Sequence, residues 1–255
     1  MSLRSLPSLR PSPVPRGRGD VLRISPRAGD VGPASYGYDN LAHQAALGAH
    51  LLEFDVRVTA DDDLVVFHDG SLVPAGGGDA VRVRDLPAAQ VPAAVPRCAD
   101  VIADAARAGL GLYADVKSLT ATGAARLAAL LDAHGMADRT ILASGRPHVV
   151  ALCASAAPGL PRAILFYAVD DVDPVALAAE CDAQFVHPCW EWLPAPHETL
   201  ASAAWLGPAR AAGLGVVCWH EERRPVAEGL YGLGVDGICS DDIALLATVA
   251  APSGP

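Results

Sequence analysis

Two pairs of charged residues stand at the ends of apolar runs, where their spacing could place each pair on one face of a strand. Glu53 and Asp55 lie in the run Leu-Glu-Phe-Asp-Val, and Asp115 and Lys117 close the run Tyr-Ala-Asp-Val-Lys. Side chains two positions apart in a β-strand point to the same side. Carboxylates inside a barrel or at its mouth are costly unless a cation or protons neutralise them.

Three carboxylates that meet at one point would form a hard oxygen site, which suits Mg²⁺ or Ca²⁺ better than Zn²⁺. We therefore expect Glu53, Asp55 and Asp115 to bind a divalent cation as a cofactor. The residues alone leave a second interpretation open, in which Glu53 or Asp55 pairs with Arg57 or another arginine of the barrel. Lys117 is the only lysine of the chain, and it is a candidate for a role that a planar guanidinium cannot fill.

Two further residues could act on a bound phosphate. His68 lies in Phe-His-Asp, after a second short apolar run, and an imidazole beside a bound anion can donate a proton to a leaving oxygen. Arg27, in Ser-Pro-Arg-Ala-Gly, follows the first apolar run and could clamp a phosphate. Taken singly, a histidine such as His68 is usually a surface hairpin residue, and Arg27 could equally be a surface loop arginine.

The elements that would position these residues are short apolar runs that alternate with amphipathic helical segments. This alternation is typical of parallel β-strands joined by helices. Eight such units in about 230 residues favour a (β/α)8 barrel over an open doubly wound sheet. The expected strands are Val21–Ser25, Leu51–Arg57, Gly111–Lys117, Thr140–Ser144, Arg162–Tyr167, Gln184–His187, Leu214–Trp219 and Val235–Ser240.

One run breaks the alternation. Leu64–His68 follows Arg57 too closely for a parallel crossover, so it must form a hairpin, with a bend at Asp61–Asp63. We expect this hairpin to bring His68 beside Asp55 at the barrel mouth. Residues 70–96, rich in Gly and Pro, are expected to be an excursion over that mouth and not a separate domain.

Length, composition and charge indicate a globular protein and argue against nucleic-acid binding and a membrane span. The chain has 255 residues, of which 51% are hydrophobic, so it can bury a substantial core. The formal net charge of −10 argues against a nucleic-acid partner, and no apolar run is long enough to span a membrane. Six scattered cysteines without a Cys-x-x-Cys pair are typical of reduced thiols in a cytoplasmic protein.

We expect a disordered tail over 1–20, one barrel domain over 21–250 and a short tail over 251–255.

Several segments together resemble the glycerophosphodiester phosphodiesterase family, barrel enzymes of the same superfamily as phosphatidylinositol-specific phospholipase C. The most specific are Leu-Glu-Phe-Asp-Val-Arg-Val-Thr-Ala-Asp and Val-Val-Phe-His-Asp, at 52–61 and 65–69. Gly-Val-Asp-Gly-Ile-Cys-Ser-Asp at 234–241 is similar to the last strand of the family, and Val-Val-Cys-Trp at 216–219 to the strand before it. Ala-Asp-Val-Lys at 114–117 takes the place of a Glu-x-Lys element.

The resemblance implies a barrel hydrolase that cleaves a small glycerophosphodiester into glycerol 3-phosphate and an alcohol. It also implies a role for each matching residue: Glu53, Asp55 and Asp115 as ligands of the metal, Lys117 and Arg27 as phosphate-holding groups, His68 as one of two catalytic histidines, and Trp219 as a residue of the pocket.

The chain departs from the family pattern at several of these positions. The first strand of the family ends in His-Arg-Gly, and its histidine is the second catalytic group. Here Pro26 stands in that place, and proline can neither accept nor donate a proton. The other departures are Tyr38-Asp39-Asn40-Leu41 for Pro-Glu-Asn-Thr, Asp115 for a glutamate, His220 where a threonine usually follows the tryptophan, and a shorter 70–96 excursion.

The missing histidine leaves three outcomes open. In the first, another imidazole substitutes for it: His187, at the end of the sixth expected strand, or His220, after the seventh, both of which we expect in the substrate-binding site. In the second, the metal and His68 act on another phosphoester or a diphosphate whose leaving group needs no such assistance. In the third, the chain is a catalytically silent module that binds a phosphate-bearing ligand.

Overall fold

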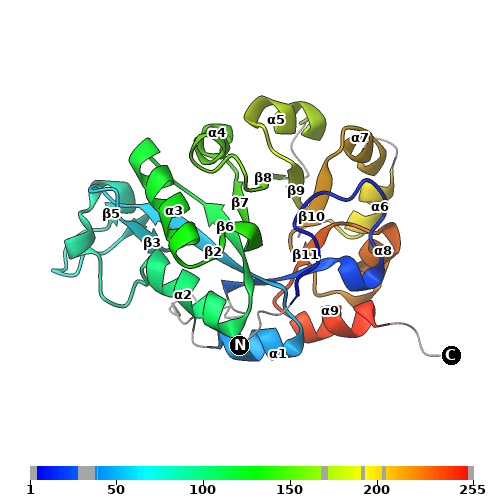
Figure 1. Ribbon diagram of the computed structural model, residues 1–255, viewed down its shortest axis with the longest axis horizontal. Coiled ribbons are helices and arrows are strands. Elements are labelled where there is room, and N and C mark those ends of the chain that lie inside the picture. The colour runs from blue at the N-terminus through cyan, green and yellow to red at the C-terminus, as the bar shows by residue number, and fades with distance from the viewer. Residues whose placement is uncertain are drawn as a thin grey trace.

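Eight parallel strands form a closed barrel in the computed structural model, which describes residues 5–27, 38, 40–167, 172–190, 193–202 and 205–251. Their order is β1-β11-β10-β9-β8-β7-β6-β2, and pairing of β1 with β2 closes the ring (Figure 1). This confirms the predicted (β/α)8 barrel. The strands are β1 (Leu22–Pro26), β2 (Leu51–Val58), β6 (Gly111–Val116), β7 (Thr140–Ser144), β8 (Arg162–Tyr167), β9 (Phe185–Cys189), β10 (Gly215–Cys218) and β11 (Gly237–Cys239).

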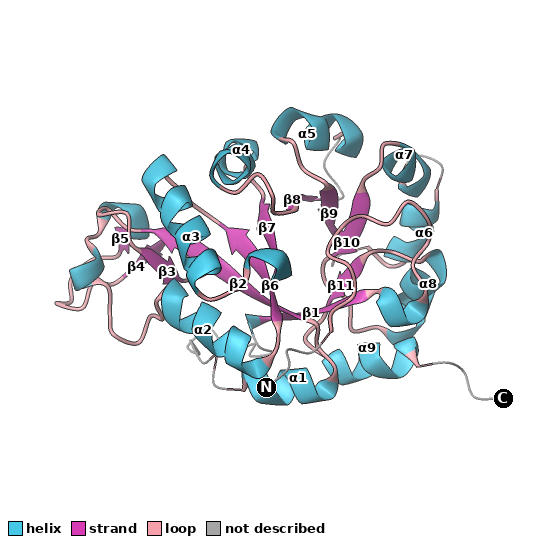
Figure 2. Cartoon of the chain, in the orientation of Figure 1, coloured by secondary structure: helices cyan, strands magenta, loops and turns pink. Residues whose placement is uncertain are grey.

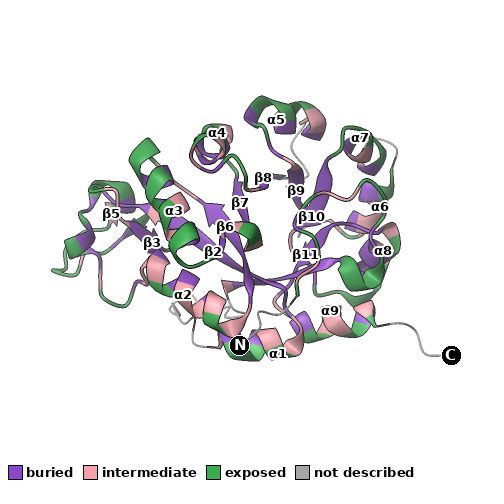
Figure 3. Cartoon of the chain, in the orientation of Figure 1, coloured by how far each residue is buried: buried purple, intermediate pink, exposed green. Residues whose placement is uncertain are grey.

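Helices cover the outside of the barrel (Figure 2). Their outward faces are exposed, whereas the strands are buried (Figure 3). The helices are α1 (Leu41–Leu47), α2 (Cys98–Ala108), α3 (Ala121–Ala133), α4 (Pro147–Ala156), α5 (Pro174–Cys181), α6 (Pro196–Ala201), α7 (Leu206–Ala211), α8 (Arg224–Leu233) and α9 (Ile243–Ala250). None of the described helices is long and apolar enough to cross a membrane.

The alternation of side chains along β2 explains how acidic residues come to lie inside an apolar barrel. Leu52, Phe54 and Val56 face outward into the core between strands and helices. Glu53 and Asp55 therefore face the barrel interior. The interior below them is apolar and is filled by residues from every strand of the barrel, among them Leu22, Leu51, Tyr113, Ile141, Ala163, Phe185 and Val217.

The predicted hairpin is present. β3 (Leu64–Val66) pairs antiparallel with β2, with Arg57 opposite Val65, and Asp62 has a left-handed backbone (φ 60°) in the bend. The backbone N–H of Phe67 donates to the carbonyl of Asp55 over 3.0 Å, which fixes the next residue, His68, beside the end of β2.

The predicted position of the 70–96 excursion is wrong. This segment contains β4 (Ser71–Leu72) and β5 (Val81–Arg82) and lies beyond β3, at the side of the barrel (Figure 1). It encloses its own small apolar cluster, made of Val65, Leu72, Val83, Leu86, Val91 and Val95. Burial of these side chains draws the segment against β3, and none of its residues lines the pocket at the barrel mouth.

Residues 5–20 also differ from the predicted disordered tail, because they pack across the N-terminal ends of the strands. Leu9 joins the apolar cluster inside the barrel. The buried Arg16 guanidinium donates to Asp236 over 2.8 Å, just before β11. Residues 1–4 and 252–255, the ends of the two predicted tails, lie outside the described residues.

Candidate active site

Three carboxylates meet where β2 and β6 reach the mouth of the barrel. Asp55 and Asp115 are direct partners in the parallel register of the two strands, and Glu53 lies one inward position below Asp55. Each of the three offers an oxygen within 4.8 Å of the others, and their exposed fractions are only 2, 3 and 5%. Glu53 Oε2 and Asp115 Oδ1 are buried and have no hydrogen-bond partner. These oxygen atoms fit a hard divalent cation.

The electrostatics of the carboxylates also favour a positive ligand. Burial raises the pKa of Glu53 well above its usual value, and the nearby Asp55 and Asp115 raise it further. Burial likewise raises the pKa of Asp115. A cation bound among these groups would offset both effects and hold the carboxylates ionised.

Lys117, and not an arginine, is the basic partner of this cluster among the described residues. Its Nζ lies 3.2 Å from Asp55 Oδ1 and 2.5 Å from Asp115 Oδ2. Burial lowers the pKa of the ammonium, but the charges of Asp115 and Asp55 outweigh burial, so the pKa is raised above its usual value. The cluster is therefore neutralised in part, and one ammonium leaves two negative charges unmatched if all three carboxylates ionise.

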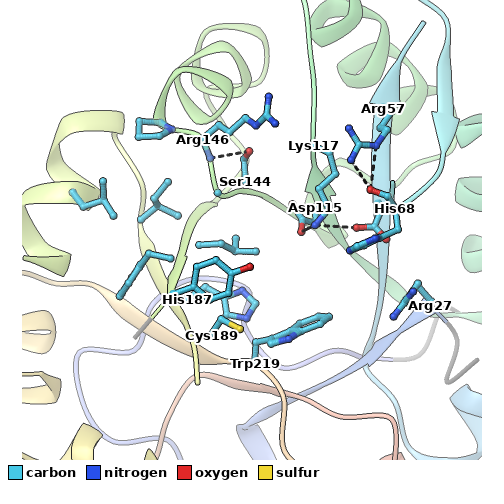
Figure 4. A pocket seen from close by; sticks show the side chains of 18 residues that line it. Arg27, Arg57, His68, Asp115, Lys117, Ser144, Arg146, His187, Cys189 and Trp219 are labelled. Atoms are coloured by element: carbon cyan, nitrogen blue, oxygen red, sulfur yellow. Dashed lines mark hydrogen bonds and ion pairs between the residues drawn. The ribbon is translucent and has the colours of Figure 1, made fainter. Parts of the chain in front are cut away.

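A pocket of about 710 Å³ opens above the carboxylates (Figure 4). Its charged side includes Asp55, Asp115, Lys117 and His68, all predicted site residues. The opposite side is largely apolar, with Ile164, Leu165, Phe166, Leu177 and Trp219.

His68 is accessible from this pocket. Its side chain is 57% exposed, and its Nδ1 lies 2.9 Å from Asp69 Oδ1. The carboxylate beside Nδ1 holds the ring by one nitrogen and leaves Nε2 for a substrate. His68 is thus positioned to exchange a proton with a group bound over Asp55 and Asp115.

Pro26 and Arg27 end the first strand beside the carboxylates. Pro26 is the register partner of Glu53, so the residue that replaces the family histidine directly adjoins the acidic cluster. Arg27 lines the pocket with a left-handed backbone (φ 42°), and its charge lowers the pKa of Glu53, partly against the effect of burial. Residues 28–37 and Asp39 lie outside the described residues.

The two histidines proposed as replacements have different surroundings. His187 lines the pocket, is 1% exposed and has its Nδ1 2.6 Å from the Tyr113 hydroxyl. Its Nε2 is buried without a hydrogen-bond partner. His220, by contrast, does not line the pocket. It stacks on Trp219 at 5.5 Å and lies with Glu222 and Asp241 in a separate group.

The pairing with Tyr113 determines what His187 can do. Burial raises the pKa of Tyr113 well above its usual value, so the phenol keeps its proton and can donate a hydrogen bond to His187 Nδ1. Burial, with the nearby charge of Lys117, lowers the pKa of His187 to about 3, so the imidazole is neutral and a poor base. In the tautomer that accepts from Tyr113 at Nδ1, the ring carries its proton at Nε2 and presents an N–H donor to the pocket.

Among the residues of this site that sequence reasoning missed, three bear on its charge and hydrogen bonding. Tyr113 lies two positions before Asp115 on the inner face of β6, a signal that the alternation of the strand provides. Arg57, considered only as an ion-pair partner, lines the pocket by the same rule. Arg146 follows β7 in a loop and has no periodic signal that would have identified it.

Comparisons with known proteins agree with this geometry. A model of the glycerophosphoryl diester phosphodiesterase family matches residues 39–245. A search of curated proteins found no match. Among solved structures, an Agrobacterium tumefaciens C58 glycerophosphodiester phosphodiesterase is 21% identical, with a TM-score of 0.68, over 89% of this chain and 99% of that one.

Two other structures are similar in fold. A Silicibacter pomeroyi DSS-3 protein with a provisional glycerophosphoryl diester phosphodiesterase name is 22% identical over 95% of both chains, with a TM-score of 0.73. An Oleispira antarctica phosphodiesterase, solved with its product sn-glycerol-3-phosphate, is 17% identical over 90% of this chain and 96% of that one, with a TM-score of 0.72. The family match spans most of the chain, and the chain therefore belongs to the glycerophosphoryl diester phosphodiesterase family.

Proposed function

We propose that this chain is a metal-dependent hydrolase of glycerophosphodiesters, which releases glycerol 3-phosphate and an alcohol with Mg²⁺ or Ca²⁺ as cofactor. The observation that carries the proposal is the buried group of Glu53, Asp55 and Asp115, with two oxygens that lack partners, at the base of the pocket. The product found in the Oleispira antarctica structure supports glycerol 3-phosphate as the phosphate-bearing half. The six free cysteines support a reducing, cytoplasmic location.

Each residue has a role that its position allows. Glu53, Asp55 and Asp115 would hold the cation, which would act as a Lewis acid on the phosphate. Arg27 and Lys117 line the pocket from opposite sides of Asp55 and would bind the phosphate oxygens. His68 would give its proton to the leaving oxygen of the alcohol, since its ring is open to the pocket and held by Asp69.

His187 would take only part of the function of the missing histidine. Its Nε2–H can donate a hydrogen bond to a substrate oxygen, but a pKa lowered to about 3 makes it a poor base at neutral pH. The attacking water would then lack an imidazole base at the place of Pro26. We expect slow turnover, with His187 orienting the substrate and His68 as the acid. His220 is the weaker candidate because it lies outside the pocket lining.

The position of Pro26 supports a second candidate, a silent member that binds a phosphate-bearing ligand without turnover. Pro26 is the register partner of Glu53, and so occupies the place where the family has a proton-transferring group. Retention of three buried carboxylates favours the enzyme, because such groups are costly to keep without a bound cation.

The two candidates are separated by hydrolysis of glycerophosphocholine in Mg²⁺, in Ca²⁺ and in a chelator, by the native chain and by Pro26→His. Release of glycerol 3-phosphate that needs the cation, and that rises by about 10²-fold or more in Pro26→His, supports the hydrolase. A native chain that binds the cation but releases no product, with its activity restored in Pro26→His, supports the silent member. Equal release with and without the cation would rule out the proposed metal dependence.

A further inference from the structure

Arg57 occupies the layer of the pocket directly above the carboxylates. The register pairs Asp55 with Asp115 and Val56 with Val116, so Arg57 and Lys117 are the next inward positions on β2 and β6. The Arg57 guanidinium is held by backbone carbonyls: its Nε lies 3.1 Å from the oxygen of Phe67 and 3.2 Å from that of His68. Both acceptors are neutral, so they fix the position of the guanidinium without cancelling its charge.

Arg146 provides a second guanidinium on the same side of the pocket as Arg57, which we call the positive rim. It immediately precedes α4, and its backbone N–H donates to Ser144 Oγ over 3.2 Å. Its side chain is exposed, and no carboxylate within the described ranges forms an ion pair with it. Arg146, Lys117 and Arg57 lie along one side of the pocket, across from Trp219 (Figure 4). Burial lowers the pKa of Arg57 and the charge of Arg146 lowers it further, whereas the charges of Asp55, Asp69 and Asp115 raise it.

With a divalent cation bound, the positive charge of this pocket would exceed the single negative charge of a phosphodiester. Arg27, Arg57, Lys117 and Arg146 provide four positive charges against the four negative charges of Glu53, Asp55, Asp69 and Asp115, so the charges match before any cation is bound. A bound divalent cation would leave an excess of two positive charges. A phosphodiester carries one negative charge. This positive rim belongs to a chain whose formal net charge is −10, and in which arginines outside the pocket, such as Arg16 and Arg162, pair with carboxylates.

We infer that Arg57 and Arg146 form an anion-binding subsite beside the reacting phosphate, so that the preferred substrate carries a second anionic group, a carboxylate or a phosphate monoester, on its alcohol half. This inference rests on the proposed function. Guanidinium groups bind both kinds of anion through paired N–H donors, and Arg57 is already fixed in place by the hairpin.

Two matched pairs of substrates test the subsite. Glycerophosphoserine differs from glycerophosphoethanolamine by one carboxylate, and a glycerophosphoinositol phosphate differs from glycerophosphoinositol by one phosphate monoester. Within each pair the ratio of kcat/KM isolates the added anion. We expect the native chain to favour the anionic member of at least one pair by about tenfold or more, and the pair with the larger ratio identifies the anion.

Arg146→Gln should bring that ratio close to one, because it removes one guanidinium without touching the carboxylates. Arg107→Gln is the matched control: Arg107 is an exposed arginine of α2 that pairs with Asp104 away from the pocket, and its removal should keep the native ratio. A native ratio near one in both pairs, or a preference that Arg146→Gln leaves intact, overturns the inference.

Failure of the proposed function would be visible separately. If the native chain hydrolyses none of the four diesters in Mg²⁺ or Ca²⁺, the hydrolase proposal fails. The subsite is then decided by calorimetry with the same pairs: tighter binding of the anionic member, lost in Arg146→Gln, supports it, and equal binding of both members overturns it.

Discussion

Buried carboxylates at the two ends of the barrel differ in whether all their oxygens have hydrogen-bond partners. At the N-terminal end, Asp236 accepts hydrogen bonds from Arg16 Nε at 2.8 Å, from the backbone N–H of Ser12 at 3.0 Å and from that of Val216 at 2.9 Å. At the C-terminal end, Glu53 and Asp115 each keep an oxygen without a partner. Both sites are almost fully buried. The hydrogen-bonded carboxylate stabilises the fold, whereas the two oxygens without partners fit the cation that we propose.

The largest effect is expected at the C-terminal end. Asp55→Asn should lower kcat/KM for glycerophosphodiesters by about 10³-fold or more, because it weakens a cation site that contributes several kcal/mol to the transition state. Stability in a chelator should be unchanged or higher, since one buried charge is removed from the cluster. Steady-state kinetics and urea unfolding measure the two quantities. A variant that loses stability without losing activity would contradict this assignment.

At the N-terminal end we expect a substitution to lower stability and to leave catalysis unchanged. Asp236→Ala leaves the buried Arg16 guanidinium without its carboxylate and should lower the free energy of unfolding by about 3–5 kcal/mol. The kcat of the folded fraction should stay at the native value, because the change is at the end of the barrel away from the pocket. The double variant Arg16→Met/Asp236→Ala should recover part of the loss in urea unfolding. Equal losses in both variants would show that the ion pair is not the cause.

His68 should show an effect on catalysis alone. His68→Gln keeps a polar side chain at an exposed position and should lower kcat by about 10²-fold, with less than about 0.5 kcal/mol change in stability. Asp69→Asn is the companion variant, and we expect a smaller decrease because the imidazole remains. A native kcat in His68→Gln would remove His68 from the chemistry.

The smallest effect is the dependence of stability on pH and on the cation. Glu53 and Asp115 have folded-state pKa values raised above their unfolded values. Their contribution to stability is therefore present below the unfolded pKa values and is lost as pH rises through the folded ones. In a chelator, Glu53→Gln should gain stability relative to the native chain as pH rises above the usual pKa of a glutamate, about 4.

A bound cation should instead make the native chain more stable than Glu53→Gln. At 100 times its Kd, a bound cation adds about 2.7 kcal/mol to the stability of the native chain and should raise its Tm by roughly 5–10 °C. Thermal unfolding of both proteins at pH 5 and pH 7, with and without Mg²⁺, makes the comparison. Identical pH dependence in the two proteins would show that Glu53 does not titrate as described.

Much of the barrel and the core of the site could be predicted from sequence, because both depend on short-range patterns. The expected strand Leu51–Arg57 differs from β2 by one residue, and Gln184–His187 differs from β9 by two at its end. Because Glu53 and Asp55 are two positions apart on β2, they were predicted to share one face of the strand. Because active sites of barrels lie at the C-terminal ends of the strands, Asp115 was predicted to lie near them.

The rest depends on partners that are distant in sequence. A segment rich in Arg, Pro and Ser gives no local sign that Arg16 meets Asp236, which follows it by 220 residues. The hydrogen bond between Tyr113 and His187 joins positions 74 apart. Arg146 is placed by a loop, where no period applies. The 70–96 segment packs beside β3 because of its own apolar cluster, which composition alone did not reveal.

The central claim is most directly tested by calorimetric titration of Mg²⁺ and Ca²⁺ into the chelator-treated native chain and into Asp55→Asn and Glu222→Gln. The second variant probes the other group that could hold an ion, His220 with Glu222 and Asp241. We predict one ion per native chain, a Kd at least tenfold weaker in Asp55→Asn, and native binding in Glu222→Gln. Native binding in Asp55→Asn, or no binding to the native chain, would contradict a cation site at Glu53, Asp55 and Asp115.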